Sequence, residues 1–138
     1  MTLTVEESKD TIEQIIDNIP WAYQEVTVKI YCEPYAKNMM ALTYKGLAVT
    51  PAMTESVIRN TETKPLFWVV THIESGWEVA SSNNPHWFTE NQALYFLYLL
   101  TKFADWTKTF EGLSVYKTDK NFLKKLNRAT LEAKKAKK

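Results

Sequence analysis

The feature that most constrains the fold of this sequence is an apolar helical segment that begins at Thr89. Thr89 and Gln92 have the spacing of a capping box, in which the hydroxyl accepts from a backbone N–H and the amide reaches back. Apolar side chains then recur at the spacing of one helix face, and Gly112 ends the pattern. The face consists of Ala93, Phe96, Leu97, Leu100, Phe103 and Ala104.

The remaining sides of this helix are apolar or aromatic too, because they carry Leu94, Tyr95, Tyr98 and Leu99. A helix that is apolar almost all round is buried on more than one side. We therefore expect a sheet against one side and either another helix or a second copy of the chain against the other. The second arrangement predicts a homodimer.

A helix is also predicted near the N-terminus, over residues 5–18. Thr4 and Glu7 form a second capping-box pattern, and isoleucines follow it at helical spacing. Pro20 ends this helix, since proline has no N–H to donate and restricts the residue before it.

A last helix follows a cap at Thr118 or Asp119. One side of it is apolar, with lysines on the others, and that side carries Phe122, Leu126, Ala129 and Ala133. Past Ala133 the basic tail 134–138 has nothing to bury, so we expect it to fray.

Between the first two helices, alternating or apolar segments predict about five strands: 21–31, 39–44, 47–50, 66–73 and 77–80. Lys45-Gly46 suits a tight hairpin turn between two of them. Short links between strands favour a largely antiparallel sheet, and helices segregated from strands indicate an α+β class. The prediction is one α+β domain over residues 1–133, whose sheet packs on the central apolar helix between N-terminal and C-terminal helices.

Length and composition indicate the number of domains and the cellular compartment of the protein. The 138 residues fit a single domain, and the one cysteine, Cys32, excludes an intrachain disulfide, as is usual in a reducing compartment. No secretory signal pattern opens the chain. The longest apolar run, Ala93–Leu100, is far shorter than the roughly 20 residues that span a bilayer. We therefore expect a cytoplasmic protein that does not enter a membrane.

Motifs for catalysis or cofactor binding are absent from the sequence. The three glycines are dispersed, so no phosphate-binding loop is present, and His72, His86 and Cys32 do not have metal-ligand spacing. A Cys32–His72 nucleophile pair is conceivable if their strands are neighbours, but a buried thiol and a hydrogen-bonded sheet histidine are the ordinary roles of these residues. The sequence predicts no enzyme, cofactor or metal.

Two carboxylates, Glu74 and Glu78, flank the turn at Gly76. Paired carboxylates can perform acid–base chemistry, but carboxylates beside an exposed turn are usually solvated. We expect the solvated state for both.

The clearest functional candidate is the basic C-terminus. Residues 117–138 carry nine Lys/Arg against two acids, a balance of +7, although the whole chain has a net charge of only +1. Such a cluster can neutralise phosphates, and a solubilising tail explains it equally well. The candidate nucleic-acid-binding residues are Lys117, Lys120, Lys124, Lys125, Arg128, Lys134 and Lys135.

A second candidate is an aromatic face on the first strand, formed by Trp21, Tyr23 and Tyr31. Aromatic rings on an open sheet face can stack on unpaired bases or anchor a protein partner. Alternatively, a helix covers that face, which is the commonest outcome.

These observations predict a small non-catalytic binding protein that engages nucleic acid or a nucleoprotein assembly through its basic C-terminal helix. The alternative is a protein-binding accessory factor, such as an adaptor, assembly subunit or inhibitor, which acts on a protein partner through the aromatic sheet face or the apolar helix. In that case an acidic protein is the partner that suits the basic end.

Overall fold

The fold is described here from a computed structural model, for residues 5–29, 36–52, 67–79, 88–107 and 120–136. Within these ranges, three helices and one four-stranded antiparallel sheet give an α+β fold, as the sequence predicts. The helices are α1 (Val5–Asn18), α3 (Glu90–Leu100) and α5 (Lys120–Ala133). The strands are β1 (Ala22–Lys29), β2 (Ala36–Tyr44), β3 (Leu47–Pro51) and β4 (Trp68–His72), and they lie in this order across the sheet.

The hairpin between β2 and β3 turns at Lys45 and Gly46, as predicted. Both residues have positive φ, 49° and 87°, which is the backbone geometry that matches the twist of a two-residue hairpin. The hairpin pairs Tyr44 with Leu47 and sets the register along both strands. Because side chains alternate along a strand, β3 then places Leu47 towards one face of the sheet and Ala48 towards the other.

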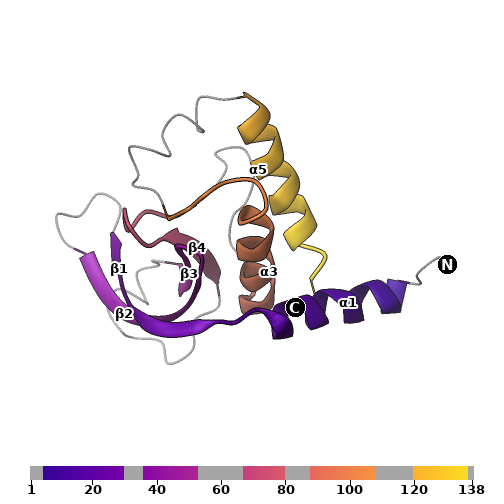
Figure 1. Cartoon of the computed structure of the whole chain (residues 1–138), viewed down its shortest axis with the longest axis horizontal. Helices are drawn as coiled ribbons and strands as arrows, with labels where there is room; N and C mark the ends of the chain where they lie inside the picture. Colours follow the sequence, from indigo (N-terminus) through magenta and orange to yellow (C-terminus); the bar gives the residue numbers. More distant parts are fainter. Residues whose placement is uncertain (1–4, 30–35, 53–66, 80–87, 108–119, 137–138) are drawn as a thin grey trace.

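The sheet is strongly curved, so that its two ends approach each other (Figure 1). After β4 the chain turns back, and the backbone N–H of Lys29 on β1 donates to the carbonyl of Gly76 in this turn, at 2.9 Å. The curved sheet encloses a small apolar cluster of Val26, Val28, Ala41 and Ala48.

The fifth predicted strand, 77–80, is not a strand over its described residues. It contributes one isolated bridge, in which Glu78 lies opposite Thr71, and a backbone bond from Val79 N–H to the Val70 carbonyl at 2.8 Å. Residue 80 lies outside the described residues. The turn bends the chain towards β1, so the pairing with β4 stays too short to form a regular ladder.

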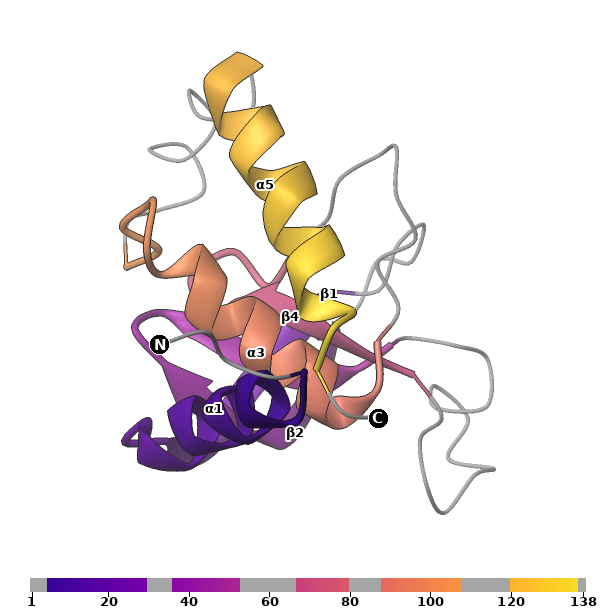
Figure 2. The ribbon, with the colours of Figure 1, turned by 90° about the vertical axis from the view of Figure 1, so that its right-hand side faces the viewer.

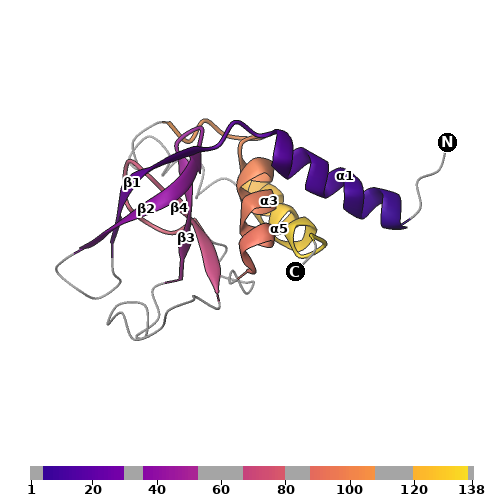
Figure 3. The ribbon, with the colours of Figure 1, turned by 90° about the horizontal axis from the view of Figure 1, so that it is seen from below.

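The main core lies between the sheet and the helices. Helix α3 packs on β3 and β4 with one side and on α5 with the other, while α1 covers a third side. Figure 2 shows α5 and α1 on either side of α3, and Figure 3 shows the sheet at the opposite side of α3 from α5. Helices α5 and α1 of the same chain therefore pack on the sides of α3 that the sheet leaves open. A second copy of the chain is not needed to bury α3, so this reason for expecting a homodimer no longer applies.

Helix α3 begins as predicted and ends earlier than predicted. Thr89 is the N-cap, and both bonds of the capping box with Gln92 are present. The helix ends at Leu100, before the predicted face positions Phe103 and Ala104, because the Thr101 hydroxyl donates to the carbonyl of Tyr98 at 2.6 Å and the Trp106 indole donates to that of Leu100 at 2.7 Å. Gly112, the predicted end, lies outside the described residues.

Helix α5 has the predicted bounds and apolar side, but the chain after Ala133 does bury a residue. Ala136 is only 4% exposed, and the N–H groups of Lys135 and Ala136 continue the turn by bonding carbonyls at 3.0 and 3.1 Å. The expectation that nothing past Ala133 is buried is therefore wrong at Ala136, because the turn directs this methyl group into the main core. Residues 137–138 lie outside the described part of the chain.

Candidate nucleic-acid interface

The outer face of α5 is basic and exposed. Its inner face packs on α3 through Phe122, Leu126, Ala129 and Ala133, and the sequence places no cation on that side. Lys120, Lys124 and Arg128 are spaced four residues apart, so they follow one another along the exposed side. Lys125 is exposed as well. Leu131, which is 63% exposed, lies on the same side as this row.

Within the described ranges, four of these cations have no acidic partner: Lys120, Lys124, Lys125 and Arg128 make no ion pair there. Lys135, just beyond α5, pairs with Glu132 at 2.9 Å. A row of unpaired cations keeps its positive potential available to a partner. Lys117 lies outside the described residues.

Lys134 is exposed as well, but it lies over an aromatic ring rather than in the row of Lys120, Lys124 and Arg128. Its ammonium lies 4.5 Å from the centre of the Phe88 ring, and its backbone carbonyl accepts a bond from the Gln92 side chain at 3.2 Å. The end of α5 is thereby fastened to the start of α3.

Of the three residues predicted to form an aromatic face on the first strand, only Tyr23 is exposed among the described residues. Trp21 is half-buried, its indole N–H donates to the carbonyl of Ile16 at 3.0 Å, and its ring meets Tyr44 edge-on at 6.1 Å. Tyr23 is 67% exposed, and Tyr31 lies outside the described residues. Helix α3 separates β1 from α5, so the structure does not bring Trp21 and Tyr23 together with the lysines (Figure 3).

A group that sequence reasoning did not single out lies on the outer side of α3. The Tyr95 and Tyr98 rings are nearly parallel, with centroids 6.2 Å apart, and the Lys102 ammonium lies 4.7 Å from the centre of the Tyr98 ring. The pKa of Lys102 is raised, first because of its side-chain hydrogen bond with Tyr98. The i, i+4 spacing of Tyr98 and Lys102 is the sequence signal that could have identified this contact.

His72 is a structural histidine in this fold. It is 2% exposed, and its Nε2 lies 2.9 Å from the carbonyl oxygen of Trp106, while its Nδ1 lies 2.8 Å from the Ser75 hydroxyl. Both ring nitrogens are engaged, which agrees with the hydrogen-bonded sheet histidine expected from the sequence. His86 and Cys32 lie outside the described residues.

The two carboxylates of the Gly76 turn differ from each other. Glu74 is exposed, as expected, but Glu78 is half-buried and faces the same side of the curved sheet as Thr71. Burial raises the pKa of Glu78 from 4.5 to about 7. The solvated state expected for Glu78 is therefore wrong, because its short bridge to β4 turns the side chain inward. No group of three or more His, Cys, Asp or Glu within the described ranges could hold a metal ion.

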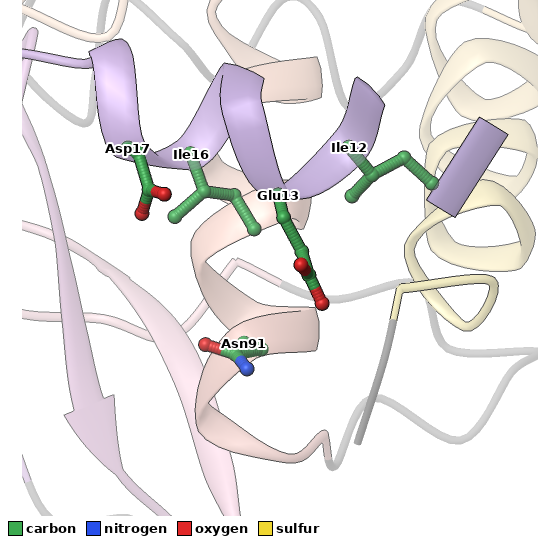
Figure 4. Close-up of a pocket in the computed structure, with 5 residues that line it drawn as sticks. All are labelled: Ile12, Glu13, Ile16, Asp17 and Asn91. Carbon is green, nitrogen blue, oxygen red and sulfur yellow. The ribbon is translucent and has the colours of Figure 1, made fainter. Parts of the chain in front are cut away.

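Among the described residues, surface pockets lie beside α1 and at the β2–β3 hairpin. One, of about 170 Å³, lies between α1 and the start of α3 and is lined by Ile12, Glu13, Ile16, Asp17 and Asn91 (Figure 4). Its carboxylates disfavour phosphate.

The other pocket, of about 410 Å³, lies at the β2–β3 hairpin, where Lys45 and Glu74 both line it beside Tyr44 and Gln24. The hairpin end therefore presents both signs of charge.

In the described part of the chain, no helix has the length and apolar character needed to cross a membrane. Comparison of the chain with models of known families, with curated proteins and with solved structures finds no match.

Proposed function

We propose that this protein is a small non-catalytic binding protein that engages nucleic acid, or a nucleoprotein assembly, through the outer face of α5. The observation that carries the proposal is the row of Lys120, Lys124 and Arg128, which is exposed and has no acidic partner among the described residues. Four residues of helix rise by about 6 Å, so the row presents cations at a spacing on the scale of neighbouring phosphates.

Phosphate contacts of this kind give a recognisable salt dependence. Each neutralised phosphate releases condensed counterions, so the logarithm of the affinity falls linearly with the logarithm of salt concentration. Lysine predominates over arginine in the row, which favours backbone contacts over base-edge recognition. The proposal therefore concerns binding with little sequence preference.

The test is fluorescence anisotropy with labelled oligonucleotides at about 50 and 200 mM salt. Cutting the chain before α5 would remove Phe122 and Leu126 from the core, so charge reversal is the sharper variant. Arg128→Glu should weaken binding and lower the salt slope by about 1. Lys29→Glu is the matched control, since it makes the same charge change on an exposed residue of β1.

Absence of binding at the lower salt concentration would overturn the proposal. Equal losses in Arg128→Glu and Lys29→Glu would do the same, because the effect would then come from net charge rather than from α5.

A protein-binding accessory factor is the second candidate function, supported by an apolar patch on the outer face of β1 and β2. Tyr23 is 67% exposed and Met40 49% exposed, and their strands are paired so that the two residues lie diagonally across the ladder. Exposed aromatic and methionine side chains are typical anchors of protein interfaces. A complex recovered from native lysate that survives nuclease treatment and is lost in Tyr23→Ser would favour this candidate over the first.

A further inference from the structure

Lysine ammonium groups and tyrosine rings form a connected band that leaves the end of α5, crosses α3 and reaches the β2–β3 hairpin. We name it the lysine–tyrosine band, and it consists of Lys135, Tyr95, Tyr98, Lys102, Tyr44 and Lys45. Its residues come from three separate segments of the chain, at 44–45, 95–102 and 135, which is why the linear sequence does not display it.

The contacts along the band are direct at both of its lysine–ring pairs. The Lys102 ammonium lies 4.7 Å from the centroid of the Tyr98 ring, and the Lys45 ammonium lies 5.3 Å from that of Tyr44. Tyr95 is buried, and its ring lies nearly parallel to that of Tyr98, with an interplanar angle of 13°.

The β2–β3 hairpin lies beside the chain that follows α3, since a Cβ at Gly46 would lie 2.5 Å from the carbonyl oxygen of Trp106, four residues beyond Lys102. Burial raises the pKa of Tyr95, and Glu132 on α5 adds to this effect while Lys135 and Lys102 oppose it. Tyr44 in turn contributes to the raised pKa of Lys102, after the larger effect of Tyr98. These electrostatic effects agree with the close approach of the hairpin to the chain beyond α3 and with the packing of α5 on α3.

We infer that the lysine–tyrosine band is the path of a single-stranded nucleic acid, whose phosphates bind Lys102 and Lys45 and whose unpaired bases stack on Tyr98 and Tyr44. This inference rests on the proposed function and names its substrate class. The ammonium groups of Lys102 and Lys45 attract phosphates, although Glu74 also lines the pocket beside Lys45, and ring faces next to the cations select bases that are not already stacked in a duplex.

Binding on the band is an exchange of partners. In the free protein, each ammonium covers a ring face that is only half-buried. An arriving phosphate attracts the ammonium away from the ring, and the exposed face then accepts a base. The α5 row alone offers phosphate contacts to single and double strands alike, whereas this exchange favours the single strand.

The experiment compares a single strand of about 12 nucleotides with its duplex by anisotropy, for the wild type and three variants. Lys102→Gln removes one band cation, and Tyr98→Leu removes one ring. Lys29→Gln is the matched control, because Lys29 also lies over an aromatic ring, at 5.4 Å from Trp77, and is outside the band. Circular dichroism verifies that each variant is folded.

Lys102→Gln and Tyr98→Leu should each weaken single-strand binding by about tenfold and leave duplex binding within about twofold of the wild type. Tyr98→Phe keeps the ring and should bind the single strand like the wild type. If Tyr98→Leu fails to fold, Lys102→Gln still tests the inference, because Lys102 is exposed and its replacement should not affect folding.

The inference about the band would be overturned if the protein bound single strand and duplex with equal affinity and Lys102→Gln bound the single strand no more weakly than Lys29→Gln. The proposal that α5 binds nucleic acid would remain. Absence of binding by either probe at low salt would overturn both, so the two failures are distinguishable.

Discussion

His72 and Trp106 are joined by a hydrogen bond that connects the sheet to the chain beyond α3. The Nε2 atom of His72 lies 2.9 Å from the carbonyl oxygen of Trp106. Since a carbonyl can only accept, Nε2 carries the proton and Nδ1 accepts from the Ser75 hydroxyl, whose oxygen accepts in turn from the Trp77 N–H at 3.2 Å. The tautomer of His72 is therefore set by its two neighbours.

Replacing this histidine should be costly. In His72→Leu, the buried Trp106 carbonyl and the Ser75 hydroxyl lose their partner, so the free energy of unfolding should fall by about 2–3 kcal/mol. Ser75→Ala removes one of the two His72 bonds, together with the bond from the Trp77 N–H, and should cost about 1–2 kcal/mol. Denaturant unfolding followed by tryptophan fluorescence measures both, and a His72→Leu variant as stable as the wild type would contradict the structural role.

The two glycine turns should differ in their tolerance of alanine. A Cβ at Gly46 would lie 2.5 Å from the Trp106 carbonyl oxygen, and φ there is +87°. At Gly76 the nearest atom, the Thr27 carbonyl oxygen, would be 3.0 Å away, with φ +78°. Both changes impose backbone strain of about 1 kcal/mol, and Gly46→Ala should lose at least as much again from the clash. Thermal unfolding should therefore rank Gly46→Ala below Gly76→Ala, and the reverse order would contradict the close approach of Gly46 to residue 106.

Glu78 should make stability depend on pH. Its pKa is raised to about 7 by burial, so between 4.5 and about 7 the folded state binds the proton more tightly than the unfolded state. The free energy of unfolding contributed by this group therefore falls as pH rises through that window, by up to about 3 kcal/mol.

Glu78→Gln should remove this contribution, so the variant becomes more stable than the wild type above about pH 7 and the difference vanishes near pH 4. Glu74→Gln, in the same turn but exposed, is the control and should change stability by less than about 0.5 kcal/mol. Urea titrations at a series of pH values decide the matter, and a stability difference for Glu78→Gln that does not vary with pH would contradict it.

Gln92 should stabilise two helix ends at once. Its side-chain oxygen accepts from the Thr89 N–H at 3.1 Å, and its side-chain nitrogen donates to the Lys134 carbonyl at 3.2 Å. Gln92→Leu loses both bonds and should cost about 1–2 kcal/mol. Thr89→Ala should cost about 1 kcal/mol and affect the start of α3 alone. Amide hydrogen exchange should show faster exchange at the end of α5 in Gln92→Leu only.

Local signals in the sequence were sufficient to locate the three helices, apart from the end of α3. Pro20 limits α1, the Thr89–Gln92 pair begins α3, and the apolar spacing from Phe122 defines the buried side of α5. Each of these signals acts within a few residues, so no knowledge of the rest of the chain is required.

The differences between prediction and structure come from contacts between distant segments. The pairing of Lys29 with Gly76 curves the sheet and leaves 77–79 with a single bridge, and Trp106 ends α3 by bonding the carbonyl of Leu100. In the candidate site, the α5 cations are exposed as the sequence implies. The contact of Lys102 with Tyr98 could be read from their i, i+4 spacing, whereas the approach of the hairpin with Tyr44 and Lys45 to the chain beyond α3 depends on the tertiary fold.

The placement of α3 between the sheet and α5 has a consequence for how this protein can evolve. The outward side chains of α5 rest on no strand, so mutation can add, remove or reverse their charges while the architecture beneath stays intact. Selection can then adjust the strength of electrostatic attraction separately from the capacity to fold.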